Sequence, residues 1–388
     1  MSDIKIGLFS KYFHNSHRRG IGIYTHEVVN SMSKFLNSTQ IDLIDYFWPR
    51  ENYRFLTDFS KKNVQKQIIR FPGRIFEAMN KSFRWPRLEM KSGKLDLLHI
   101  MHEQFLFTKA KHTIMTIHGL GPLLYPDLYT QNYCSKWLYS LHNGLEKASV
   151  IITVSESIKH HLIHYYPKWS HKYKTTFLGI SNNFILTKDP EIQKRYLKSL
   201  NIDFPFILYV GAADPGKNLI NLLKSFSLLL TKNPELPYHL IMAGNPTWGG
   251  YHQLQSKIEE LGLNNRIHFI GYIDQANLPY LYGSSELFFF PALFEGFGLP
   301  VLEAMASGAP CLVSNRPALT EVGSDIVEYC DPESVKDMAK KLETLLGNPE
   351  KLSIIRAKGQ EYARQFTWDR TAKETIRIYE DVLGTRLT

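Results

Sequence analysis

The chain has 388 residues, 44% of them apolar, and its 46 Lys and Arg against 37 Asp and Glu give a formal net charge of +9. This length accommodates two domains, and this apolar share is ordinary for a water-soluble globular protein. Three widely spaced cysteines, Cys134, Cys311 and Cys330, argue against a disulfide framework and a cysteine metal site, and they favour a reducing, cytoplasmic compartment.

The chain shows no sign of a targeting or membrane-spanning segment. Its start, MSDIKIGLFSK, lacks a charged segment followed by a long apolar run, so we expect no signal peptide. No uninterrupted apolar stretch approaches the ~18 residues of a membrane-spanning helix.

Short apolar segments recur through the first half of the chain, with helical stretches between several of them. The first, IKIGLF over 4–9, predicts a buried parallel strand, and a loop to Gly20 and a helix follow it. Further strands are expected over 41–47, 95–100, 112–118 and 149–155. This alternation predicts a doubly wound α/β domain, which we place at 1–183.

Two glycines lie at the first strand-to-helix turn of this domain. Gly20 and Gly22, in RRGIGIY, allow backbone amides to meet a phosphate or a sugar, although many such pairs only form tight turns. The longer dinucleotide fingerprint G-x-G-x-x-G is not met, because position 25 is Thr25. We therefore expect no nicotinamide site and no other cofactor.

The positive charge is concentrated in the first domain. Residues 1–183 hold 25 basic and 13 acidic residues, whereas the rest of the chain holds 21 and 24. Within 61–94, cations are interleaved with Phe71, Phe76, Phe83 and Trp85, a mixture that suits an anionic membrane surface. The alternative is a solvated basic face or mobile loop whose aromatics pack into the core. No nucleic-acid motif accompanies the charge, so we expect no nucleic-acid partner.

A second series of apolar segments follows a polar section over 184–204, which we interpret as the interdomain connection. Strands are expected over 206–211, 238–244, 266–273, 286–292 and 309–314, with helices near 219–230 and 251–261. They predict a second Rossmann-like domain over 205–367. The spacing of apolar residues over 368–383 predicts a final helix, in a C-terminal segment of 368–388.

The stretch EGFGLPVLEAMASG, over 295–308, is the most informative part of the chain. Glu295 directly follows a buried strand, at the carboxyl end where open α/β sheets bind ligands. Gly296 and Gly298 permit close backbone approach, and the helix that begins near Leu299 directs free N–H groups and its positive end at an anion. Glu303, about one turn inside, can accept hydrogen bonds from a sugar diol. These features together predict a nucleotide-phosphate pocket. Singly, each acid could equally be a solvated surface residue.

This segment resembles the retaining glycosyltransferases of family 4 (group 1), in which two glutamates separated by seven residues follow such a strand. The resemblance covers nearly the whole chain. It implies the GT-B fold, in which two Rossmann-like domains face each other across a cleft and the terminal helix crosses back to the first domain. It also implies a nucleoside-diphosphate sugar donor, held mainly by the second domain, and an acceptor held mainly by the first.

The resemblance assigns roles to further residues. His118, in TIHGL, matches the family histidine that contacts the transferred sugar, although Gly119 stands where the family often has Asp. The backbone around Tyr272 resembles the base-contacting segment, and Phe297 and Leu299 flank the glycine of the phosphate turn. Gly20 and Gly22 fit the family's N-terminal glycine loop.

One loop departs from the family pattern. In YVGAADPGKN, which contains Gly211, the family's phosphate-clamping lysine remains as Lys217, but Ala212 and Gly216 stand where an arginine is usual. A departing diphosphate needs cations, so we hypothesise that Arg18 and Arg19 supply the missing charge.

The sequence therefore predicts a metal-independent, retaining glycosyltransferase that uses a GDP- or UDP-sugar donor. Its acceptor is expected to be a glycan or lipid-linked, as in cell-surface polysaccharide assembly, with the enzyme in the cytoplasm or on the inner face of the membrane. Two alternatives stay open. The missing arginine is compatible with a catalytically decayed binding or regulatory subunit, and the fold is compatible with a sugar-nucleotide epimerase.

Overall fold

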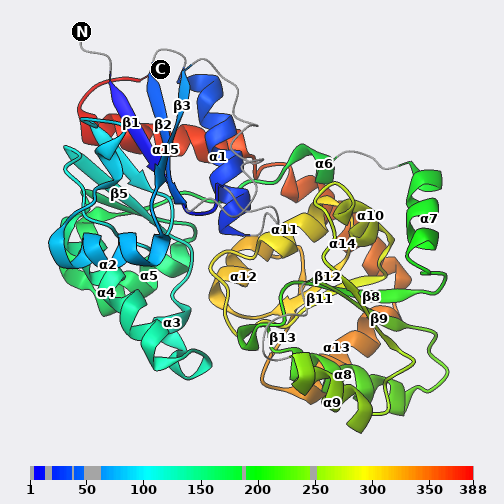
Figure 1. Ribbon diagram of the computed structural model, residues 1–388. Coiled ribbons are helices and arrows are strands. Elements are labelled where there is room, and N and C mark those ends of the chain that lie inside the picture. Colours follow the sequence, from blue (N-terminus) through cyan, green and yellow to red (C-terminus); the bar gives the residue numbers. More distant parts are fainter. Residues whose placement is uncertain are drawn as a thin grey trace. The chain divides into compact units, whose positions relative to one another are not determined.

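A computed structural model describes residues 4–13, 20–36, 39–47, 63–185, 189–244 and 251–387. The chain divides into two compact units, the first formed by Met1–Gly179 with Thr367–Thr388 and the second by Ile180–Phe366. Each unit is an α/β structure built on a parallel sheet with helices around it (Figure 1). Among the described residues, no helix has the length and apolar character needed to cross a membrane.

Unit 1 is built on a seven-stranded parallel sheet with the order β3-β2-β1-β4-β5-β6-β7. Its strands are β1 (Lys5–Phe9), β2 (Gln40–Phe47), β3 (Val64–Arg70), β4 (Leu97–Ile100), β5 (His112–Ile117), β6 (Val150–Thr153) and β7 (Tyr173–Thr175). Its α-helices are α1 (Ile21–Phe35), α2 (Gly73–Phe83), α3 (Gly121–Leu124), α4 (Gln131–Lys147), α5 (Glu156–Tyr165) and α15 (Trp368–Leu383). The 3₁₀ turns are η2 (Leu88–Met90), η3 (Pro126–Leu128) and η4 (Pro167–Lys172).

Unit 2 is built on a six-stranded parallel sheet with the order β10-β9-β8-β11-β12-β13. Its strands are β8 (Phe206–Val210), β9 (His239–Ala243), β10 (Ile267–Gly271), β11 (Leu287–Phe290), β12 (Cys311–Ser314) and β13 (Glu328–Cys330). Its helices are α6 (Asn182–Ile185), α7 (Pro190–Ser199), α8 (Leu219–Lys232), α9 (Tyr251–Glu260), α10 (Leu278–Ser284), α11 (Leu299–Ala306), α12 (Pro317–Gly323), α13 (Val335–Leu346) and α14 (Pro349–Ala363), with one 3₁₀ turn, η5 (Pro215–Lys217).

The predicted fold class of two doubly wound α/β units is confirmed, and the central strands lie where continuous apolar runs placed them. All four residues of β11, for example, are buried, which is why the run LFFF is apolar without alternation. Three strands were not predicted. β3 is a half-exposed edge strand with polar residues in its sequence, and β7 and β13 have three residues each, so none of them carries a long apolar signal.

The helices at the two unit boundaries show how the chain is divided. The section over 184–204, which we expected to be a polar connection, holds α7, and α7 packs against α10 within unit 2. Helix α15 packs against α1 and is grouped with unit 1, although it follows unit 2 in the sequence. Its Tyr379 is fully buried and its hydroxyl is hydrogen-bonded to Nδ1 of His99 on β4.

Candidate active site

The order of strands in unit 2 marks one place where ligands are expected to bind. The strand order reverses at β8: β9 and β10 follow on one side of it, and β11 lies on its other side. Leu287 of β11 is in register with Ile207 of β8. Open α/β sheets bind ligands outside the carboxyl ends of the strands at such a reversal. The loop after β8 carries Lys217, and the loop after β11 carries Glu295.

Lys217 and Glu295 form an ion pair between these two loops. The Lys217 ammonium donates a hydrogen bond to Oε1 of Glu295, and the two side chains are 23% and 13% exposed. The backbone ties the loops as well, because Leu293 N–H donates to the Gly216 carbonyl at 2.8 Å. The cation thus has a defined position at the strand ends, but it retains access to solvent and hence to a ligand.

A buried asparagine supports this loop. Asn218 begins α8 in the left-handed conformation, with φ at 61°, and its Nδ2 donates to the Pro291 carbonyl at 3.1 Å and the Pro332 carbonyl at 2.6 Å. Asparagine adopts positive φ more readily than most residues. Asn218 was not predicted from the sequence. Its position directly after Lys217, at the start of a helix, was the only available signal.

Helix α11 begins at a glycine whose backbone conformation would strain any larger residue. Gly298 has φ at 102°, and a Cβ built on it would lie 2.6 Å from Cδ2 of Leu319. Within the described part of the chain no side chain caps the helix start, so none of these residues supplies a side-chain acceptor to its positive end. The side chains of Phe297 and Leu299 are 3% and 7% exposed, and Gly296 is buried, so any ligand contact of this turn involves mainly its backbone.

Glu303 lies on the second turn of α11 and is almost fully buried, with 4% of its surface exposed. The Tyr282 hydroxyl on α10 donates to its Oε2 at 3.1 Å, and Gln275 forms a further hydrogen bond with it. Burial raises the pKa of Glu303 to about 7, while these two hydrogen bonds act in the opposite direction. Such a carboxyl exchanges its proton near neutral pH and has a strong need for hydrogen-bond donors. Tyr282 and Gln275 were not foreseen.

The loops after β8, β9 and β10 are joined by backbone contacts. Gly211 N–H donates to the Ala243 carbonyl at 2.9 Å, and Gly244 N–H donates to the Gly271 carbonyl at 2.7 Å. A Cβ on Gly244 would lie 1.9 Å from the Gly211 carbonyl oxygen, so only glycine permits this approach. Tyr272, the predicted base-contacting position, directly follows β10 and is half-buried.

His118 lies in unit 1, directly after β5. Its Nε2 is 3.0 Å from the Met101 carbonyl, and its ring meets that of Tyr24 edge-on with 4.6 Å between centroids. Burial lowers the pKa of His118. A carbonyl oxygen only accepts hydrogen bonds, so Nε2 carries the proton and Nδ1 of the neutral ring is left as an acceptor.

Glu103 orders the turn that carries His118. Its Oε1 accepts hydrogen bonds from the backbone N–H groups of His118 and Gly119. Glu103 was not predicted from the sequence. The available signal was an acid just after β4, next to β1 where the order of the first sheet reverses.

The remaining predicted positions concern the first glycine loop. Gly20 caps α1 with φ at 34°, and a Cβ built on it would meet no atom of the described residues within 4 Å. Gly22 lies in the first turn of α1 near Tyr12. Arg18 and Arg19 lie outside the described residues.

Unit 2 brings together Lys217, Glu295 and the start of α11, with Glu303 one turn further along that helix. Unit 1 brings together His118, Glu103 and Tyr24. An ammonium group, an uncapped helix start and a buried carboxyl on adjoining segments form a suitable set for a phosphate joined to a polyhydroxyl group.

Comparison with known proteins agrees with this chemistry. The family described as glycosyl transferases group 1 matches residues 192–365, all within unit 2. The chain is 29% identical over 280 residues to the O-antigen chain mannosyltransferase B of Escherichia coli. The aligned residues make up 71% of this chain and 72% of that protein.

Two solved structures share the fold over almost the whole chain. Sucrose-phosphate synthase from Thermosynechococcus elongatus has a TM-score of 0.76 at 18% identity and covers 98% of this chain and 99% of its own. The HepE protein of Anabaena, in complex with UDP and glucose, has a TM-score of 0.72 at 15% identity and covers 98% of this chain and 100% of its own. The second unit thus matches the family of group 1 glycosyl transferases, and the two Rossmann-like units together share the fold of these solved structures.

Proposed function

We propose that the chain transfers a sugar, with mannose as the first candidate, from a nucleoside-diphosphate sugar to a glycan or lipid-linked acceptor in cell-surface polysaccharide assembly. The observation that carries the proposal is the pairing of Lys217 with Glu295 beside the uncapped start of α11. The mannosyltransferase relative supports the choice of sugar, and the HepE complex supports a nucleotide donor.

In this proposal the residues of unit 2 hold the donor. The start of α11 and Lys217 bind the diphosphate, Glu303 accepts hydrogen bonds from the ribose hydroxyls, and Glu295 binds hydroxyls of the sugar. Gly211 and Tyr272 adjoin the base. His118 of unit 1 contributes a sugar contact through Nδ1, the ring nitrogen that the Met101 carbonyl does not engage, and the backbone at Gly20 and Gly22 contributes further donor contacts.

The proposed step retains the configuration of the sugar and needs no metal ion. The bond between the anomeric carbon and the diphosphate oxygen breaks, and its electron pair leaves with the diphosphate. The acceptor hydroxyl attacks from the same face, forms the new glycosidic bond and passes its proton to the departing diphosphate oxygen. Lys217 and the helix start stabilise the negative charge that develops on this leaving group.

The direct test incubates the protein with GDP-mannose, UDP-glucose and related donors, with and without acceptor, and follows nucleotide release. Transfer with one donor, undiminished by a chelator and giving product of unchanged anomeric configuration, supports the proposal. An inverted linkage contradicts the mechanism. Donor epimerisation, or binding without turnover, would indicate an epimerase or a decayed subunit instead.

The origin of the second phosphate-binding cation is a separate part of the proposal. Arg18 and Arg19 supply the positive charge that Ala212 and Gly216 cannot. If so, replacing both arginines with alanine should strongly reduce the turnover rate and change the melting temperature little. Unchanged kinetics in this double variant would show that the site works with Lys217 as its principal cation.

A further inference from the structure

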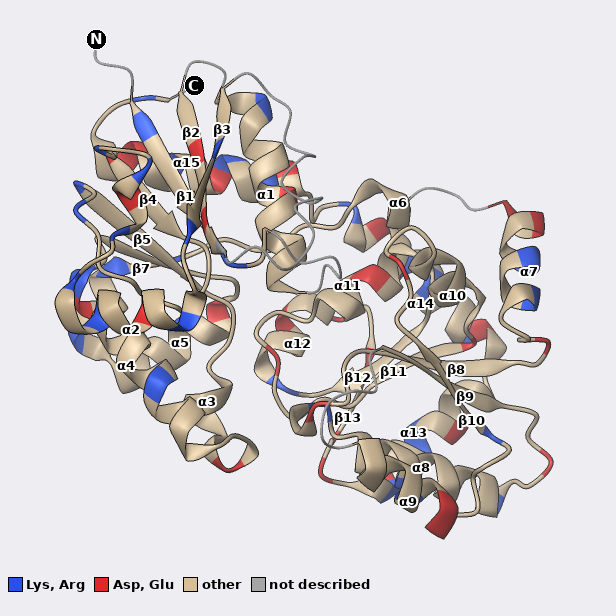
Figure 2. Ribbon diagram, in the orientation of Figure 1, with Lys and Arg blue, Asp and Glu red and all other residues tan. Residues whose placement is uncertain are grey.

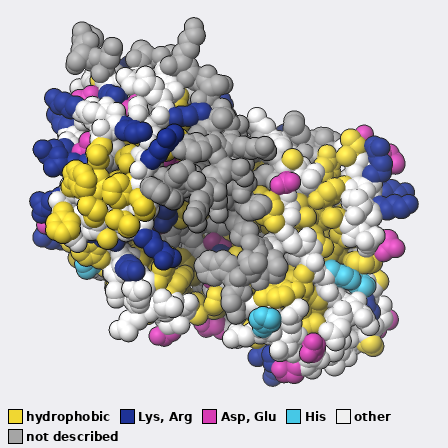
Figure 3. Space-filling model, viewed as in Figure 1, with side chains coloured by type: hydrophobic (Ala, Val, Ile, Leu, Met, Phe, Trp, Pro, Cys, Tyr) yellow, Lys and Arg dark blue, Asp and Glu magenta, His cyan; other side chains and the backbone are white. Residues whose placement is uncertain are grey.

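Unit 1 carries a second feature that the donor site does not use, an exposed apolar face on α2 and the segment after it. Phe76 and Asn80 lie on the buried side of α2, whereas Ile75 and Phe83 are 53% and 74% exposed. Ile75, Met79 and Phe83 are four residues apart, so they share one face of the helix. Figure 3 shows apolar side chains gathered on this unit with Lys and Arg around them.

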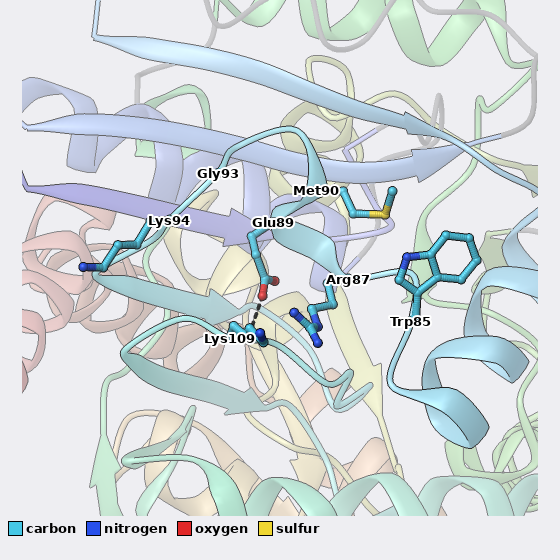
Figure 4. Close-up of a pocket in the computed structure, with 7 residues that line it drawn as sticks. All are labelled: Trp85, Arg87, Glu89, Met90, Gly93, Lys94 and Lys109. Atoms are coloured by element: carbon cyan, nitrogen blue, oxygen red, sulfur yellow. Dashed lines mark hydrogen bonds between the residues drawn. The ribbon is translucent and has the colours of Figure 1, made fainter.

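A hollow adjoins this apolar face. It has a volume of about 440 Å³ and is lined by Trp85, Arg87, Glu89, Met90, Lys94 and Lys109. Trp85 and Met90 are 49% and 54% exposed. Figure 4 shows these two at one end of the hollow and Lys94 at the other, with Arg87 and Lys109 between them. The hollow therefore combines an apolar end with a cationic one.

The acidic groups near this surface are already hydrogen-bonded within the protein. Glu89 accepts hydrogen bonds from the Thr108 hydroxyl at 2.9 Å and from the Lys109 backbone N–H, and Glu77 accepts one from the Tyr46 hydroxyl at 2.7 Å.

The surrounding cations, in contrast, have no acidic partner within ion-pair distance in the described part of the chain; they are Arg70, Arg74, Arg84, Arg87, Lys91, Lys94 and Lys109. Figure 2 shows basic residues on α2 and on the segments beside it. The surface is thus positively charged and its charge is available to a partner.

We propose that this surface, formed by α2 and residues 84–94 with Lys109, binds the protein to an anionic phospholipid bilayer. Ile75, Phe83, Trp85 and Met90 enter the boundary between headgroups and acyl chains. The cationic end of the hollow receives a lipid phosphate. An exposed apolar face bordered by unpaired cations is the pattern of a helix that lies in the membrane interface. This inference deepens the proposed function, because a lipid-linked acceptor would be met at such a surface.

The test measures sedimentation of the full-length protein with vesicles of phosphatidylglycerol and phosphatidylcholine, and with vesicles of phosphatidylcholine alone. We expect binding to the anionic vesicles only, decreasing from about 0.1 M to about 1 M NaCl because salt screens the attraction. Arg87→Gln with Lys94→Gln should weaken binding about 25-fold, at roughly fivefold for each cation. Ile75→Ser with Phe83→Ser should weaken it at least about tenfold.

Matched variants in unit 2 serve as controls. Ile192→Ser with Ile354→Ser removes two exposed apolar side chains, and Lys194→Gln with Lys198→Gln removes two exposed cations. Both should bind vesicles like the unaltered protein. Equal losses in the control and test variants would overturn the inference, as would vesicle binding that is independent of lipid charge. A changed oligomeric state of the α2 variants without vesicle binding would overturn it too, because it would identify a protein interface.

The outcome is separable from that of the proposed function. Vesicle binding by a protein that transfers no sugar would leave this inference standing and refute the transfer reaction. Sugar transfer to a soluble acceptor by a protein that never binds anionic vesicles would do the reverse.

Discussion

Replacing Glu303 with glutamine should stabilise the protein in a way that depends on pH. Burial raises the pKa of this carboxyl from 4.5 to about 7. The folded state therefore favours the protonated form, so the contribution of Glu303 to folding stability is most favourable below pH 4.5, falls as the pH rises from 4.5 to 7 and is constant above pH 7. Glutamine has no charge to bury, and its carbonyl can still accept the hydrogen bond from Tyr282.

The size of the effect follows from the difference between the two pKa values. At 1.36 kcal/mol per unit, the raised pKa of Glu303 lowers the unfolding free energy by about 1 kcal/mol at pH 5 and by about 3 kcal/mol at pH 8, because the unfolded carboxyl ionises more readily than the folded one. Glu303→Gln should recover most of this cost, so its gain in unfolding free energy should be about 2 kcal/mol larger at pH 8. In a unit of this size, 1 kcal/mol corresponds to a shift of about 2–4 °C in melting temperature.

The assay is thermal unfolding of both proteins at pH 5 and pH 8, with Glu259→Gln on the exposed side of α9 as a control that should shift neither curve. Donor affinity should move in the opposite direction, since an ionised Glu303 is the better acceptor for ribose hydroxyls and the variant lacks it. A stability gain of equal size at both pH values would refute the reasoning, because the burial cost would then not come from ionisation.

Three further predictions concern the loops around the donor site. Lys217→Met should lower kcat by a factor of about 10²–10³ and leave the fold intact, because it removes the cation beside the leaving group; initial rates measure the effect. Lys224→Met on the exposed side of α8 is the control, and comparable rates in the two variants would contradict the role of Lys217. Asn218→Ala should cost about 2–4 kcal/mol in chemical unfolding, because two buried carbonyls lose their donor and alanine is strained at positive φ. Asn218→Gly should cost less, and equal costs would rule out the contribution of backbone strain. Gly298→Ala should reduce both stability and donor affinity, because the new methyl group meets Leu319 and the positive φ disfavours alanine. The readout is a lower melting temperature that shifts less when a nucleoside diphosphate is added. A variant that melts and binds like the unaltered protein would show that the helix start tolerates a side chain.

How well each part of the fold could be predicted depended on the length of its local signal. The buried central strands were predictable because residues covered on both faces must be apolar throughout, as in β11. Helix α15 was predicted at its observed bounds, because one face with buried Trp368, Ile376 and Tyr379 repeats along it. The three unpredicted strands lacked such signals, because β3 is half-exposed and β7 and β13 have only three residues each.

The candidate site divides in the same way. Glu295, Gly298 and Glu303 were predictable as a group, because strand, glycine turn and helix follow one another within fourteen residues of sequence. Tyr282 and Glu103 were not, because each acts on a residue that a different element carries. A hydroxyl or carboxyl with a distant partner looks in the sequence like any other polar residue.

The order of residues along the chain was by itself sufficient to predict two α/β units and a buried strand that is followed by a glycine turn and a helix start, the pattern on which the proposed anion site depends. These properties depend on local periodicity and on the conformational freedom of glycine. Only the tertiary structure decided that Lys217 pairs with Glu295 across 78 positions of sequence, that Glu303 is buried beside Tyr282, and that α2 leaves an apolar face exposed. Pairing and burial depend on which strands become neighbours in a sheet, and that order is set by packing of the whole unit.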